Sequence, residues 1–148
     1  MNYFKILAIL SALGGSSAYA AGTSDESSAT DSAADYQTAE AAILAGNFAE
    51  AVPILAAITS AEPENADAWN LLGFASRKSG DLAAAGVAYG KALDINPEHL
   101  GALEYQGEMY LQLMQPELAK ANLAKLQSLC GDCEEAEDLA QALAAAGV

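Results

Sequence analysis

Basic side chains, histidine and cysteine are scarce in this chain, and each shortage weakens the case for a class of function. The 148 residues include six lysines and arginines, one histidine and two cysteines, against 20 aspartates and glutamates. With one histidine and no motif that sets a serine beside a base and an acid, a serine-type nucleophilic site has no support. Glycine-rich phosphate-binding loops are also missing. The sequence therefore predicts a protein that is not an enzyme and uses no cofactor.

The shortage of basic residues leaves a formal net charge of −14. Nucleic acid and anionic lipid carry the same sign of charge, so the protein would repel both of them. The charge favours a basic partner, although an acidic surface also serves solubility alone. We therefore predict a protein or peptide partner and no nucleic acid.

What is present in the chain is a repeat. Residues of the same or similar type recur 34 positions apart, and these pairs are Gly46 and Gly80, Pro63 and Pro97, Trp69 and Leu103, and Gly73 and Gly107. A 34-residue period in a chain rich in alanine and leucine is typical of helix-turn-helix repeats stacked into a solenoid.

The clearest unit, residues 66–99, shows why each recurring position is needed. Gly73 lies within a first helix, where the missing side chain lets a partner helix approach closely. Gly80 can adopt the left-handed conformation that ends this helix, and Asp81 follows as the N-cap of a second helix. Pro97 marks the end of that helix. One short turn thus joins two antiparallel helices.

This unit resembles a tetratricopeptide repeat (TPR). The residues that match the family pattern are Trp69, Leu72, Gly73, Gly80, Ala85, Tyr89, Ala92 and Pro97. The resemblance implies an all-α fold, a TPR solenoid of three repeats over about 32–65, 66–99 and 100–133. A C-terminal capping helix over about 133–146 completes the predicted TPR domain, residues 35–148.

Two further predicted helix starts carry capping signals. Asn47 and Glu50 have the spacing of a capping box at the second helix of the first repeat. Asp132 and Glu135 have the same spacing before the capping helix, where we expect Asp132 to be the N-cap.

The first 20 residues resemble a signal peptide. Lys5 precedes an apolar run over residues 6–13, and the small-x-small sequence that ends at Ala20 suits signal peptidase. We expect cleavage after Ala20, export to the bacterial periplasm, and no stable membrane insertion after processing. An uncleaved anchor is the alternative. Residues 21–34 are rich in serine, alanine and aspartate and are predicted to be a disordered linker.

Cys130 and Cys133 are the only cysteines, and they lie between the third repeat and the capping helix. In an oxidising compartment such a pair usually forms a disulfide, which is the interpretation adopted. Redox activity and metal binding are the alternatives. The acidic neighbours Asp132, Glu134 and Glu135 would raise a thiol pKa and so oppose redox activity. One Cys-x-x-Cys is only half a zinc site, and no metal site is predicted.

The resemblance also implies a groove lined mainly by the first helix of each repeat. The residues expected to face it are Tyr36, Glu40, Asp67, Asn70, Phe74, Arg77, Lys78, Glu104 and Glu108. Their mixture of acidic, aromatic and basic side chains suits a peptide with basic and apolar residues. Arg77 and Lys78 could instead be the solvated end of a helix.

Some members of the family hold a peptide carboxylate with a clamp of lysine, asparagine and arginine. The corresponding positions here are Tyr36, Glu40, Leu71, Gly101 and Tyr105. The clamp is therefore missing, and acidic chaperone tails are poor candidates for the ligand.

The sequence thus predicts a non-enzymatic scaffold or adaptor in the bacterial cell envelope that binds a protein or peptide in its groove. The alternatives are a thiol-redox or copper-handling periplasmic protein that uses Cys130 and Cys133, and a self-associating structural element. The oligomeric state stays open.

Overall fold

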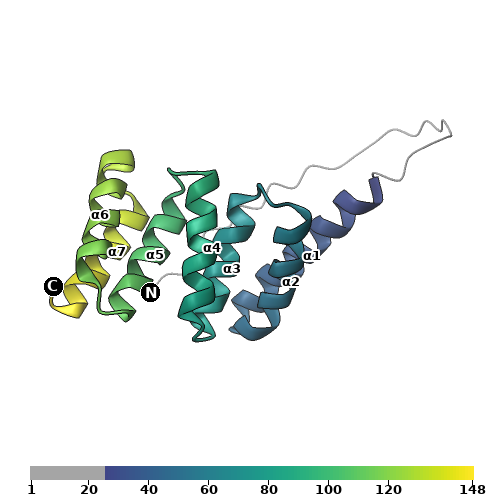
Figure 1. The fold of residues 1–148 in the computed structure, drawn as a ribbon, viewed down its shortest axis with the longest axis horizontal. Helices are drawn as coiled ribbons and strands as arrows, with labels where there is room; N and C mark the ends of the chain where they lie inside the picture. Colours follow the sequence, from purple (N-terminus) through teal and green to yellow (C-terminus); the bar gives the residue numbers. More distant parts are fainter. Residues whose placement is uncertain (1–25) are drawn as a thin grey trace.

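The computed structural model describes residues 26–148, and the predicted signal peptide over residues 1–20 lies outside them. The described part contains seven α-helices and no strand (Figure 1). In chain order these are α1 (Glu26–Leu44), α2 (Phe48–Ala61), α3 (Ala66–Lys78), α4 (Leu82–Ile95), α5 (Leu100–Gln112), α6 (Pro116–Cys130) and α7 (Glu134–Ala146). None of these helices combines the length and the hydrophobicity needed to cross a membrane.

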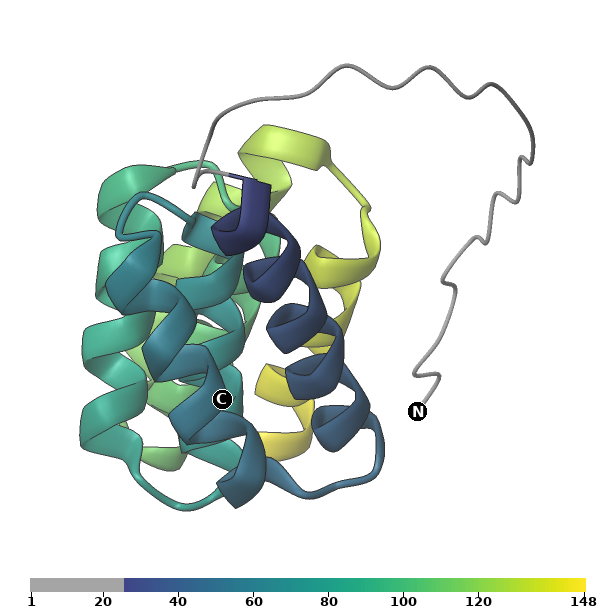
Figure 2. The same ribbon diagram turned by 90° about the vertical axis from the view of Figure 1, so that its right-hand side faces the viewer.

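The helices form two layers along one axis. Each helix packs against the next one in the chain, and α5 also packs against α3 and α7. Figure 2, which looks along the stack, shows α1 and α7 on one side and α2 and α4 on the other. We call the surface of the layer that contains α1, α3, α5 and α7 the first-helix face. The all-α solenoid predicted from the sequence is confirmed, and α7 packs on α5 and α6 at the C-terminal end.

The first helix is longer than expected. α1 begins at Glu26, so residues 26–34 are helical, although they belong to the predicted disordered linker; residues 21–25 lie outside the described part. The segment contains neither glycine nor proline to interrupt a helix.

The capping predictions have mixed outcomes. Asp81 Oδ1 accepts a hydrogen bond from the Ala84 backbone N–H at 2.9 Å, as predicted. Asp132 is not the N-cap of α7, because the helix begins at Glu134 and Cys133 occupies the cap position without a side-chain hydrogen bond. Asn47 caps α2 without a side-chain bond to the backbone, and its amide donates to Glu50 Oε2 at 3.3 Å instead.

Two glycines set the distance between packed helices. A Cβ atom on Gly73 of α3 would lie 2.6 Å from the ring of Tyr89 on α4, and one on Gly107 of α5 would lie 2.6 Å from Leu139 on α7. Tyr89 and Leu139 are both completely buried. The rings and methyl groups of the second layer and of the capping helix therefore occupy the space that a side chain at these two positions would need.

Replacing Gly73 with alanine is expected to destabilise the protein by about 1–3 kcal/mol, because the new methyl group overlaps the buried Tyr89 ring. Gly90→Ala in α4 is the matched control, since a Cβ there meets nothing within 4 Å. Gly90→Ala is expected to raise the stability by up to about 1 kcal/mol through helix propensity. Urea unfolding followed by circular dichroism measures both, and equal stabilities of the two variants would contradict the close packing.

Candidate functional site

A row of three aromatic rings crosses α2, α3 and α5. The Phe48 and Phe74 ring centroids are 5.8 Å apart in an edge-to-face arrangement, and those of Phe74 and Tyr105 are 4.9 Å apart. Arg77 Cζ lies 5.7 Å from the Phe74 centroid and 5.9 Å from the Tyr105 centroid. Lys78 Nζ lies 5.7 Å from Phe48 and 5.8 Å from Phe74. We call these five residues the aromatic–cation row, in which each cation contacts two rings.

The helical spacing explains why these side chains meet. Phe74, Arg77 and Lys78 are separated by three and four positions, so they share one face of α3. Glu104 and Glu108 are four positions apart on α5 and share the facing side of that helix. The contact between α3 and α5 then brings the basic and acidic pairs together.

Arg77 is buried in this contact. Its Nη2 lies 2.5 Å from Glu108 Oε2, and its side chain is 4% exposed while that of Glu108 is 29% exposed. The alternative that Arg77 is a solvated helix end is therefore wrong, whereas Lys78 is exposed. Two neighbouring polar atoms, Arg77 Nε and Tyr89 Oη, are buried and have no hydrogen-bond partner among the described residues.

Glu104 is a buried carboxyl beside this ion pair, with 7% of its surface exposed. Burial, together with the carboxylates of Glu108, Asp138 and Glu135, raises the pKa of Glu104 from its ordinary 4.5 to about 8, against the opposing effect of Arg77. Asp138 and Glu135 belong to α7, so the capping helix contributes to the charge at this place. Glu104 is therefore mostly protonated at neutral pH.

The two tyrosines of this region are also neutral. Burial raises the pKa of Tyr89 to about 12 despite the opposing charge of Arg77. Burial and the carboxylates of Glu104 and Glu108 raise the pKa of Tyr105 still higher. Both hydroxyl groups consequently keep their protons and can act as hydrogen-bond donors.

A second group of predicted residues lies towards α1. Burial, together with the charges of Asp67, Glu40 and Glu62, raises the pKa of Tyr36 to about 12, so these acidic side chains act on the phenol. Asp67 Oδ1 is 3.0 Å from His99 Nε2, while His99 Nδ1 accepts the Ala102 backbone N–H at 3.2 Å. The single histidine is therefore a helix cap that holds the start of α5 against α3.

Asn70 lies between these two groups and faces α5. Its Nδ2 would be 3.3 Å from a Cβ atom on Gly101, so the missing side chain at Gly101 makes room for it. Asn70 Oδ1 is buried and has no hydrogen-bond partner among the described residues. This oxygen is an unpaired acceptor within the contact between α3 and α5.

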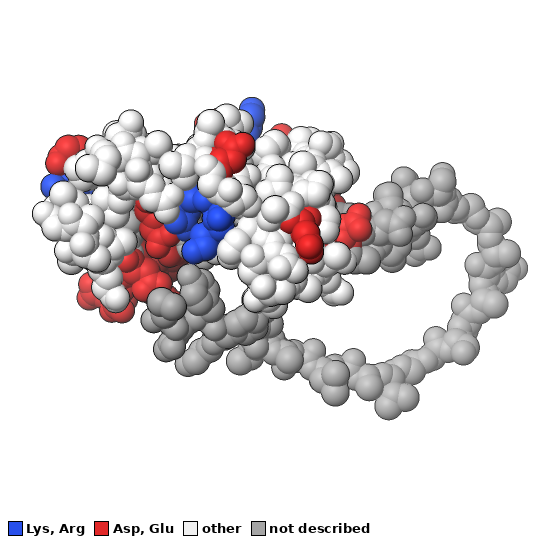
Figure 3. Space-filling view, turned by 90° about the horizontal axis from the view of Figure 1, so that it is seen from below, with Lys and Arg blue, Asp and Glu red and all other residues white. Residues whose placement is uncertain are grey.

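The surface view shows how the charges are distributed. In Figure 3 a group of blue lysine and arginine atoms lies at the middle of the stack, next to a larger group of red acidic atoms. The contacts above identify Arg77 as a neighbour of the acidic Glu108 of α5, and Lys78 as a neighbour of the Phe48 and Phe74 rings. A hollow of about 370 Å³ opens beside the row, lined by Gly46, Asn47, Phe48, Ala49, Glu50, Lys78 and Ser79.

Comparison with known families agrees with this architecture. The family model described as a tetratricopeptide repeat matches residues 66–99. The described part of the chain has the tetratricopeptide-repeat fold. This family forms extended binding surfaces by stacking its repeats, so the fold is that of a protein-interaction scaffold. Among curated proteins, none matches the sequence.

Three solved structures are similar to these repeats. MamA 41-end from Desulfovibrio magneticus RS-1 is 27% identical with a TM-score of 0.63, over 65% of this chain and 54% of that one. A MamA RS-1 ArsTM double mutant is 26% identical with a TM-score of 0.63, over 66% and 55%. The first TPR of Spaghetti (RPAP3), bound to the HSP90 peptide SRMEEVD, is 20% identical with a TM-score of 0.67, over 76% and 93%. This chain thus spans about half the length of the MamA chains, and the third likeness concerns the fold alone.

The TPR structure brings together five of the nine predicted groove residues. These are Phe74, Arg77, Lys78, Glu104 and Glu108, while Tyr36, Glu40, Asp67 and Asn70 lie nearer to α1 or between the two groups. Phe48 and Tyr105, which contact Phe74, and Glu135 and Asp138, which act on Glu104, are not among the nine predicted residues. Glu135 and Asp138 are three positions apart and so lie on one side of the capping helix, which is the signal that could have indicated a shared role.

The two cysteines form a close pair at the C-terminal end of the repeats. Their Cα atoms are 5.6 Å apart, with Cys130 ending α6 and Cys133 capping α7. Both are half-buried, and Cys133 packs on the core between α5, α6 and α7. In the described part of the chain no group of three histidine, cysteine or acidic side chains could hold a metal ion.

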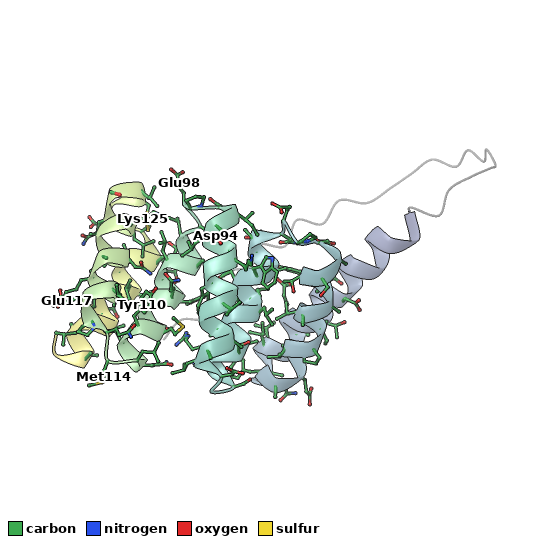
Figure 4. All side chains as sticks on the ribbon, viewed as in Figure 1. Asp94, Glu98, Tyr110, Met114, Glu117 and Lys125 are labelled. Atoms are coloured by element: carbon green, nitrogen blue, oxygen red, sulfur yellow. A yellow bond between two sulfur atoms is a disulfide. The ribbon has the colours of Figure 1, made fainter. Side chains whose placement is uncertain are left out.

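The opposite surface carries scattered charged residues and isolated apolar side chains. Figure 4 shows Asp94, Glu98, Glu117 and Lys125 spread over the side of the stack that carries α4 and α6, with Met114 at one end. Exposed apolar side chains on this surface, such as Val87 and Met114, are separate from one another in the sequence and on different elements. Isolated apolar residues are normal on soluble surfaces, so the first-helix face is the better candidate site.

The raised pKa of Glu104 predicts a pH dependence of stability. The folded state keeps a proton between the ordinary pKa of 4.5 and about 8, whereas the unfolded chain releases it. The contribution of Glu104 is therefore fully present below pH 4.5 and is lost as the pH rises to about 8. Relative to the wild type, Glu104→Gln is expected to gain about 2–4 kcal/mol between pH 4.5 and pH 8.

Urea unfolding at a series of pH values measures this difference. Glu137→Gln is the control, because Glu137 lies on α7 and is exposed. Its stability relative to the wild type is expected to stay constant with pH. A constant difference for Glu104→Gln as well would show that the buried carboxyl has an ordinary pKa.

Proposed function

We propose that the protein is a non-catalytic scaffold of the bacterial cell envelope, which binds a segment of a partner protein on its first-helix face. The observation that carries the proposal is the aromatic–cation row, which joins α2, α3 and α5 and includes the exposed Lys78. Aromatic rings and long basic side chains are enriched where proteins bind one another.

The hollow beside the row supports a peptide ligand. It is lined by the α1–α2 connection together with Phe48 and Lys78, so an apolar side chain could contact the ring while a polar one reaches the ammonium group. The free acceptor of Asn70 could receive a backbone N–H from an extended segment. Such contacts would hold a peptide along several repeats.

The expected ligand differs from the HSP90 peptide held by the first TPR of Spaghetti. That peptide, SRMEEVD, carries three acidic residues and one basic residue. The positions of the family's basic clamp are occupied here by Tyr36, Glu40, Leu71, Gly101 and Tyr105. Since none of these is basic, we propose that the ligand has a basic rather than an acidic segment.

A photo-crosslinking amino acid at position 78 is expected to capture the partner in living cells. The same amino acid in place of Lys91 is the matched control, because Lys91 is an exposed lysine on α4 and belongs to the other layer. Mass spectrometry of the crosslinked products identifies the captured protein. Equal capture from both positions would contradict the assignment of the first-helix face.

Export is part of the same proposal. Its support is the arrangement of Lys5, the apolar run over residues 6–13 and the small residues that end at Ala20. In the crosslinking experiment the mature chain is expected in the periplasmic fraction with Ala21 as its first residue. A chain that stays in the cytoplasmic fraction with Met1 intact would refute the envelope location.

The close pair of Cys130 and Cys133 supports a second candidate function, thiol redox chemistry or copper handling. We favour a structural disulfide, because the pair connects the end of α6 to the start of α7 and Cys133 packs on the core. A loop this short contributes about 2 kcal/mol at most by the loop-entropy model. Its effect would be to hold α7 against the last repeat.

The double variant Cys130→Ser, Cys133→Ser tests the two functions against each other. A structural disulfide predicts a loss of up to about 2 kcal/mol in urea unfolding, with capture of the partner from position 78 unchanged. Addition of a reductant to the wild type is expected to produce the same loss, and to leave the double variant unaffected. Unchanged stability together with lost capture would favour thiol or copper chemistry instead.

A further inference from the structure

His99 joins the second repeat to the third through both nitrogens of its ring. Its Nδ1 accepts a hydrogen bond from the Ala102 backbone N–H at 3.2 Å and so caps α5, while its Nε2 lies 3.0 Å from Asp67 Oδ1 of α3. A carboxylate can only accept, so Nε2 donates and carries the proton of the neutral ring. The ring is mostly buried, with 12% of the side chain exposed, whereas the side chain of Asp67 is 78% exposed. Both bonds therefore depend on one tautomer of a neutral histidine.

The preceding repeat has a cap at the same position that does not change its charge. Asn65 lies 34 positions before His99 and caps α3, where its Oδ1 accepts the Ala68 backbone N–H at 3.0 Å. The amide oxygen of asparagine is an acceptor whatever the pH, because the group does not titrate. Histidine ordinarily changes its charge between pH 5 and 8, and in the charged ring both nitrogens are donors. The two caps therefore respond differently to acid.

Protonation of His99 removes the cap of α5. The new hydrogen on Nδ1 would face the Ala102 N–H, which is itself a donor. Ala102 lies in the first turn, where amides have no carbonyl partner within the helix, so its N–H would lose the acceptor that the ring provides. A positive charge is also unfavourable beside the N-terminal end of a helix. The bond to Asp67 changes in the opposite direction, because a charged donor binds a carboxylate more strongly.

We propose that His99 is a pH-sensitive switch at the joint between the second and third repeats. At neutral pH the ring caps α5, and in acid it gives up the cap and is held by Asp67 of α3 as a charged pair. The first turn of α5 then opens, on the helix that also carries Glu104 and Glu108. The inference goes beyond the proposed function and does not depend on which ligand binds the first-helix face.

Three kinds of titratable group meet around His99, namely its partner, its nearest neighbours in the chain and a group on which its partner acts. They are Asp67 of α3, Asp94 of α4, Glu98 of the connection before α5, Glu104 of α5 and Tyr36 of α1. Tyr36 stays neutral, because its pKa is raised to about 12. Glu104 has a raised pKa of about 8, so it also changes its charge near neutral pH, and its effect has to be separated from that of His99.

Hydrogen exchange of backbone amides, measured by NMR on the mature chain from pH 8 to pH 5, tests the switch. Each rate is divided by the rate of an unfolded peptide at the same pH. The protection of the Ala102 N–H is expected to fall about fivefold with decreasing pH, as it loses a cap of ordinary strength. The Ala68 N–H, which Asn65 caps, is the internal control and is expected to keep its protection. Constant protection of both amides would overturn the proposal.

His99→Asn gives α5 the cap residue that the preceding repeat has in Asn65. The variant is expected to protect the Ala102 N–H equally at pH 8 and at pH 5. It retains Glu104, so any effect of that carboxyl is present in both proteins and cancels in the comparison. If the protection of Ala102 fell in His99→Asn as it does in the wild type, another group would be responsible and the switch would be refuted.

Asp67→Asn tests whether α3 holds the charged ring. Loss of the carboxylate disfavours the charged form, so the fall in Ala102 protection is expected to move to a lower pH, by up to about 0.7 pH units for an exposed partner. Glu64→Gln is the matched control, because it removes an exposed carboxylate three positions earlier and is expected to leave the transition in place. An unchanged transition in Asp67→Asn would contradict the exchange of the cap for a charged pair.

Discussion

The close approach of α3 and α4 at Gly73 is the contact on which the rest of the structure depends. The ring of Tyr89 fills the place of the missing side chain, and the phenol is completely buried. Its hydroxyl consequently lies beside Arg77, so the packing inside one repeat determines where the charged groups of the face can be. The buried arginine then reaches Glu108 on the next repeat. The close packing at Gly73 thus helps to determine where the ion pair between Arg77 and Glu108 lies.

The repeat period was sufficient to predict the fold, because it reports contacts that every repeat makes in the same way. Glycine at positions 73 and 107, alanine at position 85 and the turn at Gly80 have the same physical role in any stack of this kind. Local signals were less reliable. Asp132 and Glu135 have the spacing of a capping box, yet Cys133 occupies the cap position and the helix begins one residue later than the spacing implied.

The candidate site was predictable only in part, because the repeat pattern reports contacts within each repeat and not burial between repeats. Phe74, Arg77, Lys78, Glu104 and Glu108 lie on first helices, and the repeat pattern indicates which side of these helices faces outward. The pattern does not indicate how deeply a side chain is buried between neighbouring repeats. Arg77 and Glu104 could each have been solvated, and their burial follows from the contact between α3 and α5 and from the position of α7. Phe48 and Asp138 come from elements outside the first helices of the repeats.

The structure shows where the few basic residues of this acidic chain lie. The sequence contains a single arginine, and that residue is buried between acidic side chains. The remaining basic residues of the described part are lysines, and all four are exposed. The acidic side chains of α5 are therefore offset by one buried arginine, and this excess of negative charge is the reason for proposing a basic ligand.

The capping helix has two roles that cannot be separated. Leu139 fills the space above Gly107 and so closes the core of the last repeat, while Glu135 and Asp138 on the same helix act on Glu104. An additional repeat inserted between α6 and α7 would preserve a closed core, because α7 could cover the new unit in the same way. It would also carry two carboxylates a full repeat away from α5. The array can therefore grow in length without losing its fold, but not without changing the charge around Glu104.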